Sequence, residues 1–397
     1  MAKATEYDLW KVFPRMPKKV TIGDITIRDG FQHEEKFVST AAKIYYCQES
    51  ILAGCREYEV TNLGAPTTTP QFRDADEVMK AMRSDEFKQR CKRAGIDIEK
   101  DVTLTNVTIR ESAVDRAIQM KKEGYGPDRI LMMISTDAEH HFANSGTTQI
   151  QYWREAERCI KKARDVGIKL VGTVSTIWGS PISGATKLED AVEFTKRWFE
   201  IGAHDIEHAD HDGSANAADV YRYFSMILDA MPNPEAHLCH LHETKRIGSA
   251  MLLAALQAGI CRFELTLGGL GGQPANFIDD CPIKGTGAYY YNDPRYVGLC
   301  CLEDFLVLVD EMGIEHGYDV DRMLELGKLL EKTMGKRLRS DAVINGRTNK
   351  AGYPQFAKPG LYKLMDKEGE KRGQRIPPDW APTATLPSVW GPATWKK

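Results

Sequence analysis

The chain has 397 residues, 42% of them hydrophobic, which is enough to bury a large core as one big domain or two ordinary ones. Its formal net charge of −3, with both signs interspersed, argues against nucleic acid or an anionic membrane surface as a partner. No apolar run approaches the roughly 20 residues that span a bilayer, and the first residues lack a signal-peptide apolar region, so we expect a cytoplasmic protein with no membrane partner. The nine scattered cysteines contain no Cys-x-x-Cys pair, which favours reduced thiols.

Short β-rich runs alternate with amphipathic helical patterns after a polar lead-in segment at residues 1–19. The predicted strands are 20–27, 56–61, 102–106, 130–134, 169–174, 205–208, 237–242 and 261–267. The clearest predicted helices are 41–53, 151–166, 188–201, 217–231 and 246–258.

Eight strands separated by helices predict an α/β fold, a (β/α)8 TIM barrel, which needs about 250 residues. A doubly wound open sheet is the competing fold, but it should carry a Gly-rich phosphate-binding turn after its first strand. The charged and bulky run from Arg28 to Gln32 stands there instead. We therefore expect a barrel catalytic domain at 20–300, helices that complete it at 301–344, and an irregular C-terminal arm at 345–397.

In such barrels the catalytic groups lie at the carboxyl ends of the strands, where residues distant in sequence converge. The predicted strand ends carry Arg28, Asp29, Glu59, Asn106, Thr173, Ser175, His208, Asp210, His240 and His242. A long Gly-rich loop at 268–274 follows the last strand, and a loop of this length is usually functional or disordered.

A divalent metal site is the first prediction from these residues. His240 and His242 are two residues apart on a strand, so both imidazoles point to the same side. With Asp29 they form one carboxylate and two neutral imidazoles, a set that suits Mg²⁺, Mn²⁺ or Zn²⁺ and leaves positions for water and substrate. The alternatives are that the histidines are packing residues and that Asp29 is a plain turn residue before Gly30.

Glu59 is the second chemical candidate. A buried carboxylate in a barrel is costly unless it is hydrogen-bonded, and Arg28 or a metal-bound water is the expected partner. The alternative is a solvated glutamate at the end of its strand.

Several motifs occur together in one order and spacing. They are Thr26-Ile27-Arg28-Asp29-Gly30-Phe31-Gln32-His33-Glu34, Tyr58-Glu59-Val60-Thr61-Asn62, His240-Leu241-His242-Glu243-Thr244 and Gly269-Leu270-Gly271-Gly272-x-Pro274. From about residue 20 to about 330 the chain resembles the DRE-TIM metallolyases. It is most similar to the 3-hydroxy-3-methylglutaryl-CoA (HMG-CoA) lyases, and the same superfamily includes isopropylmalate, citramalate and homocitrate synthases.

The resemblance implies roles for individual residues. Asp29, His240 and His242 would bind the metal, and Arg28 would steady oxyanion charge. Glu59 and Asp210 would be acid/base or supporting groups. The substrate pocket would be lined by Gln32, His33, Asn106, Thr173 and His208.

Two departures from the lyase pattern concern proton transfer and metal binding. Gln273 occupies the position of the catalytic Cys in Gly-Gly-Cys-Pro and cannot ionise, although general acid–base groups typically contribute about 10²–10⁴-fold. Leu299, after Gly298, stands where the lyases have a metal-binding Asn. Replacements from the 275–298 insertion would be Cys281 as the thiol and Asn276 or Asn292 as the ligand; the alternative is a site with three protein ligands.

A basic pair, Lys245 and Arg246, begins the predicted helix after the seventh strand. Together with the helix N-terminus it suits a carboxylate or a coenzyme A phosphate, and a solvated surface pair is the alternative. His211 and the pair His140-His141 also fall near this end of the barrel, the latter as polar loop residues.

These features favour a metal-dependent carbon–carbon lyase that cleaves a 3-hydroxyacyl-CoA through an enolate, with coenzyme A as part of the substrate. The alternative is a synthase that condenses acetyl-CoA with a 2-oxo acid. A non-catalytic metal-binding relative is a third reading, disfavoured because Arg28, Asp29 and both histidines are present. Biotin-dependent carboxyl transfer lacks a recognisable lysine motif. We expect a homodimer or higher homo-oligomer.

Overall fold

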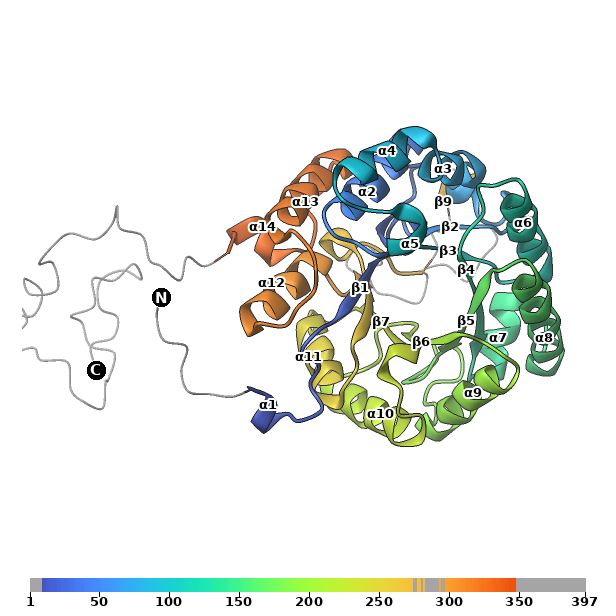
Figure 1. Cartoon of the computed structure of the whole chain (residues 1–397). Helices are drawn as coiled ribbons and strands as arrows, with labels where there is room; N and C mark the ends of the chain where they lie inside the picture. The colour runs from blue at the N-terminus through green and yellow to red at the C-terminus, as the bar shows by residue number, and fades with distance from the viewer. Residues whose placement is uncertain (1–8, 274–276, 280, 283–292, 294–296, 348–397) are drawn as a thin grey trace, which may run out of the picture. The chain divides into compact units, whose positions relative to one another are not determined.

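A computed structural model describes residues 9–273, 277–279, 281–282, 293 and 297–347. Eight parallel strands form a ring inside a layer of helices (Figure 1). The strands are β1 Thr21–Asp24, β2 Glu57–Asn62, β3 Thr103–Val107, β4 Arg129–Ser135, β5 Lys169–Ser175, β6 Asp205–Asp210, β7 His237–Glu243 and β8 Arg262–Leu265. Because β8 pairs in parallel with both β1 and β7, the sheet closes, and the predicted TIM barrel is confirmed.

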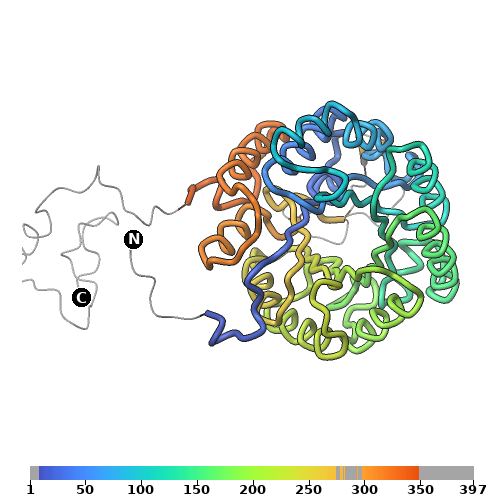
Figure 2. Tube along the Cα trace, in the orientation of Figure 1, coloured from blue at the N-terminus to red at the C-terminus, as the bar shows by residue number. Residues whose placement is uncertain are grey.

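The helices surround the strands in chain order, as the Cα trace shows (Figure 2). The longer ones are α2 Thr40–Leu52, α3 Ala75–Met82, α4 Asp85–Arg93, α6 Glu111–Lys122, α8 Gln149–Asp165, α9 Leu188–Glu200, α10 Ala217–Ala230, α11 Gly248–Ala258, α12 Leu302–Met312 and α13 Val320–Met334. Shorter helices are α1 Leu9–Val12, α5 Ile98–Asp101, α7 Ala138–Ser145 and α14 Asp341–Asn345. Within the described residues, none of the helices is long and apolar enough to cross a membrane.

Side-chain caps define where several helices begin. The Ser39 hydroxyl accepts the backbone N–H of Ala42 at the start of α2. At the start of α8, Thr148 and Gln151 form a capping box, each accepting the other's backbone N–H. Such caps satisfy the unpaired N–H groups of a first turn, typically for about 1 kcal/mol each.

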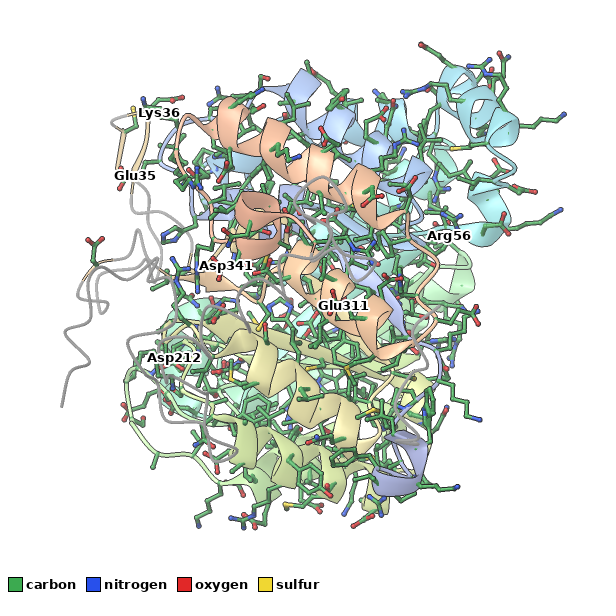
Figure 3. All side chains as sticks on the ribbon, turned by 90° about the vertical axis from the view of Figure 1, so that its left-hand side faces the viewer. Glu35, Lys36, Arg56, Asp212, Glu311 and Asp341 are labelled. Atoms are coloured by element: carbon green, nitrogen blue, oxygen red, sulfur yellow. The ribbon has the colours of Figure 1, made fainter. Side chains whose placement is uncertain are left out.

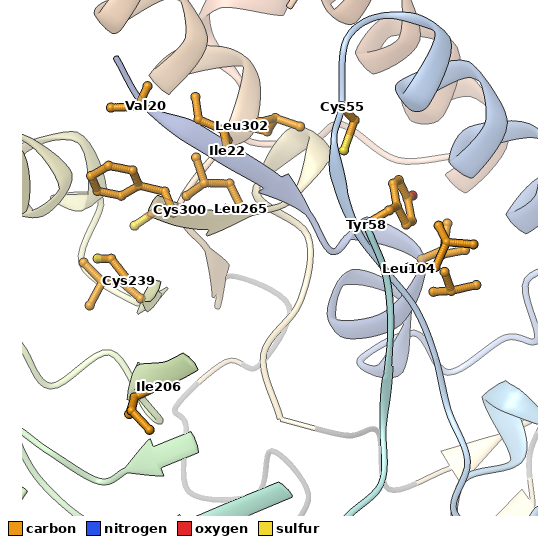
Figure 4. Close-up of a cluster of buried hydrophobic side chains, with 14 of the residues drawn as sticks. Val20, Ile22, Cys55, Tyr58, Leu104, Ile206, Cys239, Leu265, Cys300 and Leu302 are labelled. Atoms are coloured by element: carbon orange, nitrogen blue, oxygen red, sulfur yellow. The ribbon is translucent and has the colours of Figure 1, made fainter. Parts of the chain in front are cut away.

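The outward side chains of the strands form the core between barrel and helices. Ile22, Tyr58 and Leu104 are among the buried residues of this cluster in Figure 4. Gly172 on β5 allows the closest approach, because a Cβ there would lie 2.2 Å from Cδ2 of the Trp198 indole on α9. Only glycine therefore fits between this strand and its helix.

A ring of buried ion pairs fills the barrel at the amino-terminal ends of the strands. Glu57, Arg129, Asp205 and Arg262 are the first residues of the four even-numbered strands. Arg262 lies 2.8 Å from Glu57 and 3.2 Å from Asp205, and Arg129 lies 3.2 Å from Asp205. These charges pair with one another, so this end is closed by structural contacts and the opposite end remains for chemistry.

The first strand is shorter than predicted. It ends at Asp24, whose buried carboxylate accepts the backbone N–H of Thr26 at 2.9 Å and the Thr26 hydroxyl. The chain then makes one turn of π-helix, η1 (Thr26–Gly30), and this turn carries Arg28 and Asp29. A side chain that hydrogen-bonds to nearby backbone groups competes with the hydrogen bonds between strands. The hydrophobic pattern of the sequence does not reveal this competition.

The segment after β8 packs back onto the first strand. The backbone N–H of Val20 donates to the Glu315 carbonyl at 2.8 Å, and the Tyr318 hydroxyl donates to the Ile22 carbonyl at 2.7 Å. Asp8–Gly346 accordingly forms one compact unit. The finer domain boundaries at residues 19, 300 and 344 stay predictions. The expected arm begins at residue 345, and its part from 348 to 397 lies outside the described residues.

Candidate active site

The carboxyl ends of the strands gather the candidate residues at one end of the barrel. In Figure 3, Glu35 and Lys36, which follow η1, lie on the same side as Asp212, which follows β6. Arg56, which precedes β2, lies toward the other side. The carboxyl ends of the strands therefore meet at one end of the barrel, as predicted.

Asp29, His240 and His242 come together there. The Nε2 atom of His240 lies 3.9 Å from Asp29 Oδ2, and the Nε2 atom of His242 lies 3.7 Å from Asp29 Oδ1. All three residues are buried, and their ligand atoms lie within 4.8 Å of one another. In the described structure, Asp29 Oδ1 has no hydrogen-bond partner. An unpaired buried carboxylate oxygen facing two imidazoles fits a divalent cation.

The protonation of these groups also suits a cation. Burial lowers the pKa of His242 to about 3, so its imidazole is neutral. Burial alone would raise the pKa of Asp29, but Arg28 and the two histidines lower it overall. Metal ligands must be deprotonated, and both groups are in that state at neutral pH.

Arg28 links the trio to Glu59. Its Nη1 lies 2.6 Å from Asp29 Oδ2, and its Nε donates a short hydrogen bond to Glu59 Oε1. The expected partner of Glu59 is thus Arg28. The other carboxylate oxygen of Glu59 is buried and unpaired among the residues described. Arg28 is 7% exposed, so its charge acts in a nearly dry setting where electrostatic effects are strong.

Two glutamates that the sequence analysis did not single out lie beside His240. Its Nδ1 is 3.3 Å from Glu264 Oε2 on β8 and 3.9 Å from Glu207 Oε2 on β6. Burial and the neighbouring Glu264 raise the pKa of Glu207. Although burial opposes it, the contact with His240 helps to lower the pKa of Glu264. Strand alternation was the available signal for Glu207, because it stands next to the pocket candidate His208 and the two side chains must face opposite sides of the sheet.

The Gly-rich loop closes against the first barrel loop. Gln32 donates from Nε2 to the Gly272 carbonyl at 3.0 Å, and His33 Nδ1 lies 2.7 Å from the Gln273 carbonyl oxygen. The Gln273 side chain donates to the His211 carbonyl at 2.6 Å. Gly271 has φ +125°, and a Cβ there would lie 3.1 Å from Asp29 Oδ1. Glycine therefore lets this loop approach the carboxylate.

His211 is also one half of a histidine pair. Its Nε2 lies 2.9 Å from His140 Nε2, and the His140 Nδ1 lies 2.8 Å from the Ser135 hydroxyl. The His211 ring is parallel to that of His242, with 6.3 Å between centroids. His140 was expected to be a polar loop residue, but it is buried in α7 and connects β4 to β6.

The place of the expected asparagine ligand is apolar. Leu299 is fully buried in β11 (Gly298–Leu299), which pairs antiparallel with β7 so that Leu299 faces His242 in register. Cys281, in β10 (Cys281–Pro282), is exposed. The other two suggested replacements, Asn276 and Asn292, lie outside the described residues. Asp29, His240 and His242 are therefore the candidate ligands that the described residues place next to Leu299.

Asp210 holds the loop that follows β6. Its two carboxylate oxygens accept the backbone N–H groups of Ser214 at 3.1 Å and Ala215 at 3.0 Å. Burial raises its pKa to about 7. These contacts give Asp210 a role in loop shape; its acid/base role stays a prediction.

The remaining pocket candidates differ in the face of the strand on which their side chains lie. Thr173 is buried and pairs in register with Glu207, and Asn106 is fully buried with neither amide atom hydrogen-bonded inside the described region. His208 contrasts with them, because its Nδ1 lies 2.8 Å from the Tyr223 hydroxyl on α10 and its Nε2 lies 3.0 Å from His237. Alternation along β6 turns it toward the helices, which corrects the expectation that it lines the pocket.

The basic pair is not at a helix start. α11 begins at Gly248, whose N–H donates to Glu243 Oε1 at 2.7 Å, so a carboxylate of the chain already occupies that N-terminus. Lys245 donates to the carbonyls of Ser214 and Ala215, both at 2.9 Å. Arg246 is exposed in a left-handed conformation with φ +59°. Coenzyme A binding by this pair stays a prediction that this geometry does not favour.

The HMGL-like family model matches residues 19–330, most of the chain. The chain belongs to the HMGL-like family. The resemblance found in the sequence motifs is thereby confirmed.

Two curated relatives of this HMGL-like protein are similar over nearly their whole length. It is 27% identical over 324 residues to the hydroxymethylglutaryl-CoA lyase YngG of Bacillus subtilis, covering 82% of this chain and 96% of the relative. It is 26% identical over 351 residues to the (R)-citramalyl-CoA lyase of Chloroflexus aurantiacus, covering 86% and 98%. Both names are those of carbon–carbon lyases, the enzyme class that the sequence predicts.

A solved structure agrees with the fold of this HMGL-like protein. The crystal structure of the Bacillus subtilis HMG-CoA lyase matches with a TM-score of 0.70 and 25% identity, covering 83% of this chain and 98% of that one. The barrel fold is therefore shared with a lyase of the family.

Proposed function

We propose that this protein is a divalent-metal-dependent lyase that cleaves the carbon–carbon bond of a 3-hydroxyacyl-CoA thioester resembling HMG-CoA or citramalyl-CoA. The observation that carries the proposal is the buried group of Asp29, His240 and His242 next to Arg28, on the mouth of an HMGL-like barrel. The two lyase relatives support coenzyme A thioesters as substrates.

Each group at the mouth has a chemical task in this proposal. A divalent cation held by the trio would polarise the substrate's hydroxyl and carbonyl oxygens, as a Lewis acid does. Glu59, with one oxygen on Arg28 and the other unpaired within the described residues, accepts the hydroxyl proton. The hydroxyl carbon becomes a carbonyl as its bond to the neighbouring carbon breaks. The electron pair of that bond forms the thioester enolate, which then takes up a proton.

Arg28 stabilises the enolate in this scheme. Its guanidinium is fixed by the carboxylates of Asp29 and Glu59 and is almost fully buried, so it needs little rearrangement when negative charge develops. Fixed charges in a dry site of this kind are commonly worth about 10²–10³-fold in rate.

Gln273 and Leu299 favour a second candidate, a synthase that condenses acetyl-CoA with a 2-oxo acid. The Gln273 amide does not ionise and is hydrogen-bonded to the His211 carbonyl, and Leu299 is apolar. The proton-donating thiol and fourth ligand of the lyase pattern are therefore missing from these positions. In that reaction a base removes a proton from the methyl group of acetyl-CoA, and the resulting enolate adds to the carbonyl of the 2-oxo acid. Water then hydrolyses the thioester and releases free coenzyme A, so the proton-transfer group need not be the thiol of the lyase pattern.

One assay separates the two reactions. Purified protein is incubated with Mg²⁺, Mn²⁺ or Zn²⁺ and either a panel of 3-hydroxyacyl-CoA thioesters or acetyl-CoA plus 2-oxo acids. We expect acetyl-CoA and a keto product from the first set. Free coenzyme A released only from the second set would overturn the lyase in favour of the synthase. The cytoplasmic location and the homo-oligomeric state stay predictions.

A further inference from the structure

The interior of the barrel behind His240 contains an unusual pair of carboxylates. Glu207 on β6 and Glu264 on β8 flank the strand that carries His240, and both are 3% exposed. Their oxygens and the His240 nitrogen lie within 4.8 Å of one another. Two carboxylic groups in a closed interior are costly to bury, so their presence calls for a specific contact.

His240 provides that contact on the side away from Asp29. Its Nε2 faces Asp29, and its Nδ1 lies 3.3 Å from Glu264 Oε2. His240 and Glu264 are register partners across β7 and β8, so the sheet fixes their separation. On the other side, the register partner of His240 is Ala209, and Glu207, two residues earlier on β6, lies 3.9 Å from Nδ1.

We propose that Glu264 is a positioning residue of the metal centre, which holds His240 by its Nδ1–H so that the Nε2 lone pair faces Asp29. An ionised carboxylate only accepts hydrogen bonds, so Nδ1 must carry the hydrogen, and the tautomer follows. Glu207, at 3.9 Å, makes no hydrogen bond to the ring and does not select the tautomer. This inference rests on the proposed metal-dependent function.

The two glutamates supply a matched pair of variants. Glu264→Gln and Glu207→Gln make the same chemical change in the same interior and differ in which residue contacts His240. We expect Glu264→Gln to weaken Mn²⁺ binding by 10- to 100-fold, as loss of a carboxylate behind a histidine ligand typically does. The Mn²⁺ affinity of Glu207→Gln should stay within about threefold of that of the parent, because this variant keeps the contact between Glu264 and His240.

Binding is measured by calorimetry on metal-stripped protein, after thermal unfolding without metal has shown that each variant is folded. A similar loss in both variants, or no loss in Glu264→Gln, would overturn the proposal. Two ions per chain, the second lost in Glu207→Gln, would also overturn it, because the carboxylates would then be cation ligands. Parent protein that binds no Mn²⁺ or Zn²⁺ would instead refute the metal-dependent function itself.

Nitrogen NMR of the histidine rings gives an independent readout that a purely structural role would not change. In the metal-free parent we expect His240 as the Nδ1–H tautomer, assigned by the signals lost in His240→Ala. In Glu264→Gln the amide can offer either a donor or an acceptor, so the Nε2–H tautomer should appear. An unchanged tautomer in that variant would contradict the assignment.

Discussion

Arg28, in the turn η1 after β1, and Glu59, within β2, form a buried ion pair in which the Arg28 Nε donates to Glu59 Oε1. Arg28 also contacts Asp29 at 2.6 Å, so the arginine stands between the proposed base and a proposed metal ligand. In the proposed mechanism, the pair therefore links proton transfer by Glu59 to the orientation of Arg28, which would stabilise the enolate.

Glu59→Gln should lower kcat by about 10²–10⁴-fold, the usual contribution of a general base. The matched control is Glu57→Gln, two residues earlier on the same strand face, where the carboxylate pairs with Arg129 and Arg262. Breaking that buried pair should cost about 3–5 kcal/mol of unfolding free energy while leaving the turnover of folded protein close to normal. Urea unfolding and steady-state kinetics check the two outcomes; equal activity losses would contradict the division of roles.

Metal binding should stabilise the fold. If the trio binds a divalent ion, a metal concentration of 100 times the dissociation constant adds about 2.7 kcal/mol to the free energy of unfolding. A chelator that removes the metal should remove this added stability. His242→Ala should lose the metal-dependent rise in melting temperature. His204→Ala is the control, since its side chain is half exposed beside Asp205 at the start of β6. A metal response preserved in His242→Ala would argue against this site.

Gln273→Cys should make the enzyme sensitive to thiol alkylation. Burial at this position would raise the pKa of the thiol above its ordinary value of about 8.5, so lyase turnover should rise toward alkaline pH, and alkylation by iodoacetamide should abolish it. The parent has an exposed thiol at Cys281, and we expect its alkylation, or Cys281→Ser, to change activity by less than about twofold. Parent activity lost on alkylation of Cys281 would instead identify that residue as the replacement thiol.

Glu303 should give a pH-dependent contribution to stability. Burial raises its pKa to about 7, while Oε2 accepts the Gly268 N–H at 2.7 Å. Between about pH 4.5 and 7 the folded form binds this proton and the unfolded form does not, so the contribution falls as pH rises through that window. The Glu303→Gln variant has no titrating group at this position. Relative to that of the parent, its free energy of unfolding should therefore increase by on the order of 1–3 kcal/mol from pH 4.5 to 7.5.

Chemical unfolding at several pH values measures that difference. A difference that stays constant with pH would show that Glu303 is ionised in the folded protein throughout the range.

Local sequence was enough to predict the barrel and to group Asp29, His240 and His242 as candidate metal ligands. The eight strands follow from local periodicity, and any barrel places strand ends at one mouth, so Asp29, His240 and His242 could be grouped without coordinates. His240 and His242 share a face because side chains alternate along a strand. The same alternation, applied to β6, puts Glu207 and His208 on opposite faces but does not tell which of them enters the pocket.

The tertiary structure decided what the strand pattern leaves open. The register of β7 against β8 places Glu264 beside His240, and that register depends on closure of the whole sheet. Loop contacts also depend on partners far along the chain, as when the Gln273 side chain donates to the His211 carbonyl. Local sequence determines which residues share a face of a strand, but the contacts of each side chain depend on the closed barrel.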